Sequence, residues 1–363
     1  MVVTVLERQS RVGGRALTLR SFFSLGLVPQ AGPARFLGNF TRVAAFAEQC
    51  GLETADFYPS KGRIAAYLGG IRMDDYPVFG DFWGYDVPKG FAPRAIRAAR
   101  RMLARLLRRE HRETFRLRSG TDSLTNALAA ATTADFRLGA TVRAVAQDEN
   151  EVRVTFTTER GDESLAVDYV VCAVPLSILP DIEFTPPLSS AKSEAAKSIP
   201  FASAMRIFLE MRQPYWRGQG FNGFAVTDTI GEVWDVDFEA PNGPTLLVCY
   251  AREALADRLS HLSPEARIDY AIAELEHVFP GARKNFVRGT SFSWREQPWI
   301  RGGWPLVRNG FEHMIDAMRE PHLRLVFAGD YNASPDLLNV TEGAIESAER
   351  AVEQVKSLAR GAV

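Results

Sequence analysis

The chain has 363 residues, of which 46% are hydrophobic, and its formal net charge is −1. A chain of this length can bury a large core and usually forms two domains. The near-neutral charge excludes a surface built to hold nucleic acid, so we expect no nucleic-acid partner. No apolar run reaches the length of a membrane span, and the first residues lack the pattern of a signal peptide, so we expect a cytoplasmic protein.

The three cysteines, Cys50, Cys172 and Cys249, are scattered along the chain and lie in apolar stretches. A free cysteine behaves as a small hydrophobic residue, and disulfides are rare in the cytosol, so we expect buried, reduced thiols. The histidines are isolated and no cysteine pair has metal-ligand spacing, so we expect no metal site.

The chain opens with a short apolar strand, residues 2–7, that ends in Glu7. The turn that follows contains Arg11, Gly13, Gly14 and Arg15. In a dinucleotide-binding fold, an acid at the tip of such a strand holds a ribose hydroxyl, about 20 residues after a Gly-rich phosphate loop. The given sequence has no such loop ahead of the strand, so we expect it to begin at the second strand of that fold. An ordinary buried strand followed by a glycine turn is the alternative.

Residues 93–109 are rich in arginine, and their apolar residues fall on one side of a helix. The proline at position 93 suits the first turn of a helix. We interpret this segment as a solvated helix with an apolar underside. Docking to an anionic membrane or to a partner is the alternative.

The middle of the chain contains several short apolar segments. Residues 142–145 and 151–156 predict a hairpin, residues 170–175 a buried strand closed by a proline, and residues 205–210 a further strand. No linker or repeat separates these elements, so we expect two interleaved domains. We assign residues 1–60, 115–190 and 297–363 to a cofactor domain, and residues 61–114 and 191–296 to a substrate domain.

Near its end, the chain has an apolar strand, residues 325–330, that finishes with Gly329 and Asp330. After a loop, a helix begins near Thr341, which we expect to act as its N-cap. The backbone N–H groups at the start of a helix can face the phosphates of a cofactor.

The motifs at the two ends together resemble those of the flavin amine oxidase family, which includes monoamine oxidases, polyamine oxidases and L-amino-acid oxidases. Members carry E-x-x-x-R-x-G-G-R near the start and F-A-G-[ED] followed by E-G-A-I-x-S near the end. The resemblance covers most of the chain and is weakest over residues 60–115. It implies an α/β fold of two interleaved domains: a Rossmann-like FAD-binding domain, here without its N-terminal Gly-rich segment, and a substrate domain of mixed sheet and helices.

The resemblance implies non-covalent FAD as the cofactor. Glu7 would contact the ribose, and Arg15 would lie near the phosphates. Some family members carry a cysteine bonded to the flavin where this chain has Gly303, so a covalent bond at that position is excluded. The other residues that the resemblance places at the cofactor are Arg11, Gly13, Gly14, Val142, Gly329, Asp330 and Thr341.

Three residues match positions that the family uses beside the flavin. Trp294 and Trp304 keep the spacing between a Trp and an aromatic-cage Tyr in monoamine oxidases, with Trp304 in place of the Tyr; two core tryptophans are the alternative. The glycines before Trp304 indicate a close approach to a planar group. Arg206 stands where many members have a Lys bonded through water to the flavin N5, although an Arg positions water differently. A surface Arg on an edge strand is the alternative.

Arg35 matches the arginine with which L-amino-acid oxidases hold the substrate carboxylate, a task that suits a bidentate guanidinium. A structural Arg in a loop is the alternative. Asn339 and Val340 stand where the family has its second cage aromatic, so the cage is incomplete and a larger substrate fits the pattern. We expect oxidation of a C–N bond in an amine or amino acid by hydride transfer to FAD, with O2 as the acceptor.

Two alternatives stay open for the function. A related flavin desaturase or dehydrogenase would act on a substrate that is not an amine. A non-catalytic remnant or subunit would hold FAD only with a second copy or another partner that supplies the missing Gly-rich segment.

Overall fold

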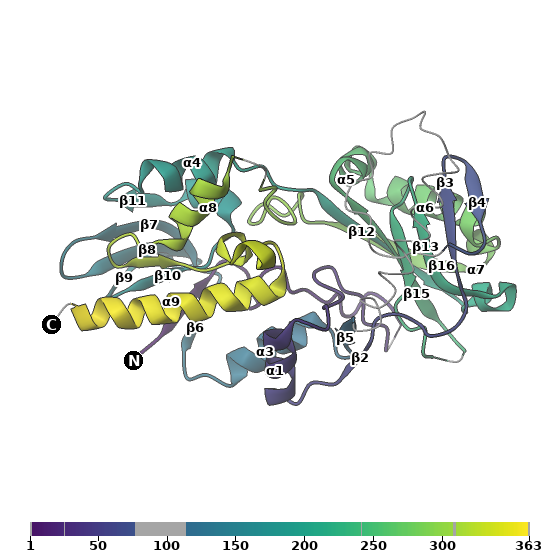
Figure 1. Cartoon of the computed structure of the whole chain (residues 1–363), viewed down its shortest axis with the longest axis horizontal. Helices are drawn as coiled ribbons and strands as arrows, with labels where there is room; N and C mark the ends of the chain where they lie inside the picture. Colours follow the sequence, from purple (N-terminus) through teal and green to yellow (C-terminus); the bar gives the residue numbers. More distant parts are fainter. Residues whose placement is uncertain (1, 25, 77–113, 241, 308–309, 362–363) are drawn as a thin grey trace.

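The computed structural model describes residues 2–24, 26–76, 114–240, 242–307 and 310–361, so the basic segment at residues 93–109 lies outside the described residues. Two lobes lie side by side, and both ends of the chain belong to one of them (Figure 1). In each lobe, strands that are distant in the sequence pair with one another.

The larger sheet has seven strands in the order β16-β12-β15-β14-β13-β3-β4. Neighbours are antiparallel except β13 and β3, which run parallel. The strand predicted at residues 205–210 is confirmed as β12, with a neighbour on both sides. The seven strands are β3 (Arg63–Leu68), β4 (Ile71–Met73), β12 (Ala204–Met211), β13 (Phe221–Thr227), β14 (Glu232–Asp235), β15 (Thr245–Arg252) and β16 (Phe286–Ser293).

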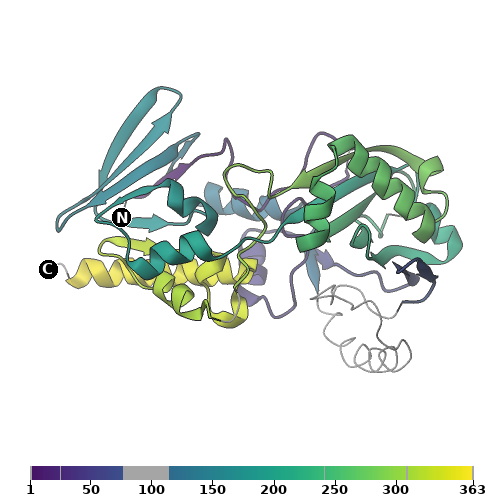
Figure 2. The same cartoon turned by 90° about the horizontal axis from the view of Figure 1, so that it is seen from above.

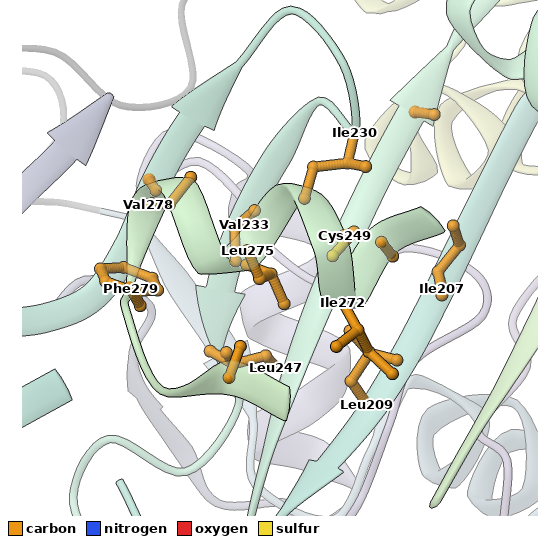
Figure 3. Close-up of a cluster of buried hydrophobic side chains, with 14 of the residues drawn as sticks. Ile207, Leu209, Ile230, Val233, Leu247, Cys249, Ile272, Leu275, Val278 and Phe279 are labelled. Carbon is orange, nitrogen blue, oxygen red and sulfur yellow. The ribbon is translucent and has the colours of Figure 1, made fainter. Parts of the chain in front are cut away.

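Helices α5 (Glu253–Ser260), α6 (Pro264–Val278) and α7 (Ala282–Asn285) pack on one face of this sheet. Figure 3 shows Ile272 and Leu275 of α6 beside Leu209 and Leu247 of the strands. Side chains alternate along a strand. Arg206 is three positions from Leu209 in β12, so it points to the opposite face. The helices therefore bury one face, and residues 17–24, 26–34 and 57–58, among them Phe23, Ala31 and Phe57, pack on the other.

The second lobe contains two parallel strand pairs, β1 (Thr4–Glu7) with β6 (Asp135–Leu138), and β10 (Val170–Cys172) with β17 (Leu325–Phe327). Where the sequence predicts a Rossmann-like sheet, the structure has these two separate parallel pairs, and no described strand joins them. The predicted hairpin is confirmed by β7 and β8. It belongs to a four-stranded sheet of β7 (Thr141–Gln147), β8 (Val152–Thr158), β9 (Gly161–Val167) and β11 (Glu183–Thr185).

Helices cover both faces of β17. Val326 packs against Ala351 and Val355 of α9 (Thr341–Gly361), the long yellow helix in Figure 2. Leu325 and Phe327 point the other way and join a cluster with α4 (Ser190–Ser198) and α8 (Glu312–Arg319). Four short 3-10 turns complete this lobe and its neighbour: Leu176–Asp181, Tyr215–Gln219, Asp330–Asn332 and Pro335–Leu337.

Helices α1 (Thr41–Gln49) and α3 (Thr121–Ala130) lie near the junction of the lobes with the pair β2 (Thr54–Asp56) and β5 (Phe115–Leu117) (Figure 1). The buried Glu342 of α9 binds the N-terminal turn of α1. Its carboxylate accepts from the backbone N–H groups of Arg42 at 2.9 Å and Val43 at 3.0 Å. An anion suits this end of a helix, where the first N–H groups have no partner in the helix.

The three cysteines are free, as the sequence predicts; Cys172 and Cys249 are buried, and Cys50 is partly buried. Burial raises the pKa of the Cys172 thiol to about 11, so it stays protonated and unreactive at neutral pH. Among the helices that the structure describes, none is both long and apolar enough to cross a bilayer.

Candidate functional site

Arg15 joins the motifs at the two ends of the chain. Its guanidinium donates to both carboxylate oxygens of Asp330, with Nη2–Oδ1 at 2.5 Å and Nη1–Oδ2 at 2.9 Å. Nη1 also donates to the carbonyl oxygen of Gly303 at 2.5 Å. Three segments that the sequence assigns to the cofactor or its reacting face therefore meet at one guanidinium.

Arg11 holds the turn after β1, because its guanidinium donates to the carbonyls of Gly14 at 2.5 Å and Ala16 at 3.2 Å. Gly13 and Gly14 have φ of 99° and 54°, in the left-handed region that glycine adopts without strain. A Cβ on Gly13 would lie 2.5 Å from Thr125 Oγ1, whereas the space beside Gly14 is open. The turn is closely packed on one side and leaves room for a ligand on the other.

Glu7 ends β1, and its Oε1 accepts from the backbone N–H of Gln9 at 2.7 Å. Ligands of α/β folds bind at this carboxyl end of parallel strands. Val142 lies at a bulge in β7 and packs, like Leu6, on the apolar cluster of Val145. Glu7 and Val142, both assigned to the cofactor from the sequence, therefore lie on adjoining elements.

Gly329 leaves β17, and its N–H donates to Ser347 Oγ of α9 at 2.8 Å. A Cβ at Gly329 would lie 2.6 Å from the ring of Tyr331, so the chain passes too close there for a larger residue. The prediction that Thr341 is the N-cap of the last helix is wrong. The carbonyl of Val340 already accepts from the N–H of Ala344, so Val340 holds the cap position and Thr341 is the first helical residue.

The face of the seven-stranded sheet opposite the helices carries a row of four side chains. Phe292, Arg206, Tyr250 and Glu232 are register partners across β16, β12, β15 and β14. Partners in register point to the same face, so the row crosses the sheet opposite the helices. Arg206 is 7% exposed on an interior strand, so the alternative of a surface Arg on an edge strand is wrong.

Arg206 lies among aromatic rings. Its guanidinium carbon is 4.6 Å from the ring centre of Tyr250 and 5.4 Å from that of Trp234. Nη1 donates to the carbonyl of Gln30, and Nε is buried with no hydrogen-bond partner among the described residues. Burial lowers the pKa of the Arg206 guanidinium to about 10, because an apolar environment disfavours its charge.

Arg35 forms an ion pair that the sequence does not predict. Its Nη1 lies 2.8 Å from Glu232 Oε2, and Arg252 Nη2 lies 3.0 Å from Oε1 of the same carboxylate. Burial lowers the pKa of Arg35, but Glu232 outweighs this effect and the pKa lies above its ordinary value. Burial likewise raises the pKa of Glu232, but Arg35 and Arg252 bring it below its ordinary value. Arg35 and Glu232 are therefore both charged at neutral pH.

Glu232 and Arg252 were missed in the sequence, although a signal existed. Each is a charged residue that alternates with buried apolar residues in its strand, such as Val233 and Ala251. An alternating charge in an otherwise buried strand indicates a polar site on one face.

Trp294 and Trp304 belong to one cluster with Tyr250 and Phe292, so the structure brings both beside the row. Trp294 is buried, donates from Nε1 to the Ala31 carbonyl at 2.9 Å, and meets the Phe292 ring edge-on at 4.8 Å. The sequence predicts that Gly302 and Gly303, before Trp304, approach a planar group, but in the structure they pack against residues 201–204. A Cβ on Gly302 or Gly303 would lie 2.6 Å from Phe201 Cβ or 2.8 Å from Ala204 Cβ, because the two segments run closely together.

A cavity of about 130 Å³ lies next to this face. Its lining includes Gln30, Ala34, Phe57 and Trp234, of which Gln30 and Trp234 contact Arg206 and Phe57 faces Arg35 at 5.4 Å. Neither this cavity nor a second hollow of about 440 Å³ beside Phe201 and Arg301 is lined by a predicted site residue, but the first is lined by residues that contact Arg206 and Arg35. The aromatic face with its charges is therefore the better candidate for a substrate site.

The fold and this arrangement define a two-lobed α/β protein with an acid at the end of its first strand and an aromatic sheet face that carries the buried Arg206. The family model of flavin containing amine oxidoreductases matches residues 1–93 and 90–356. The chain therefore belongs to the flavin-containing amine oxidoreductase family.

Curated relatives include the flavin-dependent L-tryptophan oxidase RebO of Lentzea aerocolonigenes, 29% identical over 253 residues, which are 67% of this chain and 53% of that protein. An L-amino-acid oxidase of Bothrops moojeni is 27% identical over 246 residues, 66% of this chain and 49% of that protein. The chain spans about half the length of these relatives.

Solved structures share the fold. Wild-type putrescine oxidase bound to putrescine has a TM-score of 0.78 at 19% identity, over 98% of this chain and 93% of that chain. Cyclohexylamine oxidase from Brevibacterium oxydans has a TM-score of 0.78 at 15% identity, over 99% of this chain and 93% of that chain. The expected α/β amine oxidase fold is confirmed.

Proposed function

We propose that this chain carries the catalytic site of an FAD-dependent oxidoreductase that oxidises a C–N bond of an amine or amino acid, with O2 as the electron acceptor. The single observation that carries the proposal is the contact of Arg15 with both Asp330 and the carbonyl of Gly303. Gly303 precedes Trp304, so the cofactor motifs connect directly to the aromatic sheet face.

The residues of the first lobe suit non-covalent FAD. Glu7 would accept from a ribose hydroxyl, and the open side of the Gly13–Gly14 turn would receive the phosphates. Val142 would pack on the adenine, and Arg11, Gly329 and Thr341 would shape the remainder. When bound, FAD supplies the hydride acceptor. We assign residues 1–60, 115–190 and 297–363 to this cofactor domain, and residues 61–114 and 191–296 to the substrate domain.

The chain's own task at the sheet face is to orient the substrate and keep water out. Trp294 and Trp304 would form aromatic walls, and a fixed orientation of the reacting carbon lowers the entropic barrier. Arg206 would supply a buried positive charge beside them. Because it stands in place of a lysine, a dehydrogenase that reacts poorly with O2 is the second candidate function.

The parallel strands also favour a partner strand. The carbonyls of Val3 and Glu7 bond toward β6, so alternation turns the backbone of Leu6 to the opposite edge of β1. The N–H of Val170 and the carbonyl of Cys172 form hydrogen bonds toward β17, so the backbone groups of Val171 face the opposite edge of β10. The residue Val171 is 47% exposed. We propose that one more parallel strand, from this polypeptide, a second copy or another partner, completes the sheet. The three free thiols suit a cytoplasmic location.

The test is to load the protein with FAD, record the flavin spectrum, and assay a panel of amines and L-amino acids. Peroxide release with substrate-dependent flavin bleaching supports an oxidase. Bleaching that needs an artificial acceptor for turnover supports the dehydrogenase. A protein that binds FAD but is bleached by none of these substrates contradicts C–N oxidation.

A further inference from the structure

The side chains around Glu232, on the sheet face opposite the helices, carry more positive than negative charge. Three guanidinium groups, those of Arg35, Arg206 and Arg252, surround the one carboxylate of Glu232. Arg35 and Arg252 each take one oxygen of that carboxylate. Arg206 belongs to no ion pair among the described residues, so its charge has no direct counterion there.

Such a guanidinium is costly to bury. A charge taken out of water is stabilised in a protein only when it is paired and hydrogen-bonded. Arg206 is 7% exposed, yet its Nε has no acceptor and the rings of Tyr250 and Trp234 occupy two of its sides. An orphaned buried donor in a native protein indicates a water, an ion or a ligand group that belongs there.

Tyr250 and Trp234 stabilise a cation by their ring faces but provide no counterion. A carboxylate matches the missing partner in charge and in geometry, because a guanidinium binds its two oxygens through parallel N–H groups. The resemblance assigns this task to Arg35. Arg35, however, already shares the Glu232 carboxylate, and an anion there would be repelled by Glu232.

We propose that Arg206 is a specificity-determining residue that binds the carboxylate of the substrate, so that the site selects anionic substrates, amines that carry a carboxylate group, over simple amines. The identity of the ligand as substrate rests on the proposed function; the anion site does not. The excess positive charge around Glu232 repels any additional ammonium group on the substrate. The aromatic rings around Arg206 favour a ligand with an aromatic body.

The test uses flavin-loaded protein and three probes of one shape: benzoate, neutral benzamide and cationic benzylamine. Binding is followed by the flavin spectrum and by tryptophan fluorescence. We expect the wild type to bind benzoate about tenfold or more tightly than benzamide, as a charged hydrogen bond predicts. Arg206→Met removes this preference, and Arg206→Lys keeps part of it because the charge remains. Arg35→Met keeps most of it.

Arg288→Gln is the matched control, because Arg288 lies on the neighbouring strand β16, is 43% exposed and pairs with Glu210. It should leave the preference unchanged. Thermal melting with each probe shows whether every variant folds. A wild type without preference for benzoate overturns the proposal, even if Arg206→Met fails to fold. So does a preference that survives Arg206→Met or disappears in Arg35→Met alone.

The same protein separates this proposal from the proposed function. Benzoate binding that depends on Arg206, in protein that oxidises no amine or amino acid, supports the anion site and contradicts the oxidase. Oxidation of simple amines as fast as amino acids, with no role of Arg206 in benzoate binding, leaves the oxidase and overturns the anion site.

Discussion

Arg15 and Asp330 are separated by 315 residues in the sequence and form a bidentate ion pair in which the carboxylate side chain is only 8% exposed. The arginine comes from the turn after the first strand, and the aspartate follows the last strand. The pair therefore closes the cofactor lobe on itself and also holds the Gly303 carbonyl next to Trp304.

Breaking this pair should destabilise the protein. Asp330→Asn removes the charge and keeps the shape, and we expect a loss of roughly 1.5–3 kcal/mol in the free energy of unfolding, the range for charged hydrogen bonds. Urea denaturation measures it. Asp135→Asn is the control, because its pair with Arg137 is largely exposed and such pairs contribute about 0–1 kcal/mol. Equal losses in the two variants would show that the Arg15 pair has no special role.

Glu7→Ala should weaken FAD binding by roughly 1.5–3 kcal/mol, because a charged acceptor for the ribose is lost. Quenching of flavin fluorescence on titration gives the affinity. The control is Glu151→Ala. Glu151 lies in the loop before β8, and its exposed carboxylate pairs with Arg153, so its removal should leave the affinity unchanged. An unchanged affinity in Glu7→Ala removes Glu7 from the cofactor site.

Glu232→Gln should lower stability by about 3–5 kcal/mol at neutral pH, because Arg35 and Arg252 lose their buried counterion. The folded-state pKa of Glu232 lies below its ordinary value, so its contribution is present above the unfolded pKa and is lost as pH falls through the folded pKa. Wild type should therefore lose more stability than Glu232→Gln between about pH 5 and pH 3. Parallel pH profiles of unfolding would refute this.

Arg206 should affect the reaction of reduced flavin with O2. Arg206→Lys, with a compact ammonium, should speed reoxidation, and Arg206→Met should slow it. Stopped-flow traces of the oxidative half-reaction measure both rates, and Arg288→Gln serves again as the control. If Arg206→Met leaves reoxidation unchanged, the dehydrogenase becomes the better description of this chain.

The open edges of β1 and β10 predict that an added strand improves both cofactor binding and solubility. An apolar strand with a Gly-rich turn, fused ahead of Val2, should raise FAD affinity and reduce aggregation, because unpaired edges invite pairing between chains. The control is the same segment with a proline at its centre, since proline cannot sit in an interior strand. Equal behaviour of the two fusions, or full FAD loading without either, would contradict the prediction.

The sequence determined the local elements and the family. The strand and Gly-Gly-Arg turn at Glu7, the hairpin, β12 and the final helix all depend on short-range periodicity and turn residues, which neighbouring positions encode directly. The paired terminal motifs were enough to indicate a flavoprotein of this family. The N-cap of α9 lay one residue off, because cap position depends on which carbonyl starts the helix.

Only the tertiary structure decided the charges at the sheet face. Arg35 and Glu232 are 197 residues apart, and no local pattern predicts that they meet. Whether Arg206 lies at an edge or in the interior depends on which strands flank β12, and its partners Tyr250 and Phe292 depend on strand register. Register is set by how whole strands pack and pair, so side chains that are distant in the sequence become neighbours only when the sheet is assembled. The same assembly decides that the guanidinium of Arg206 is buried without a carboxylate partner among the described residues.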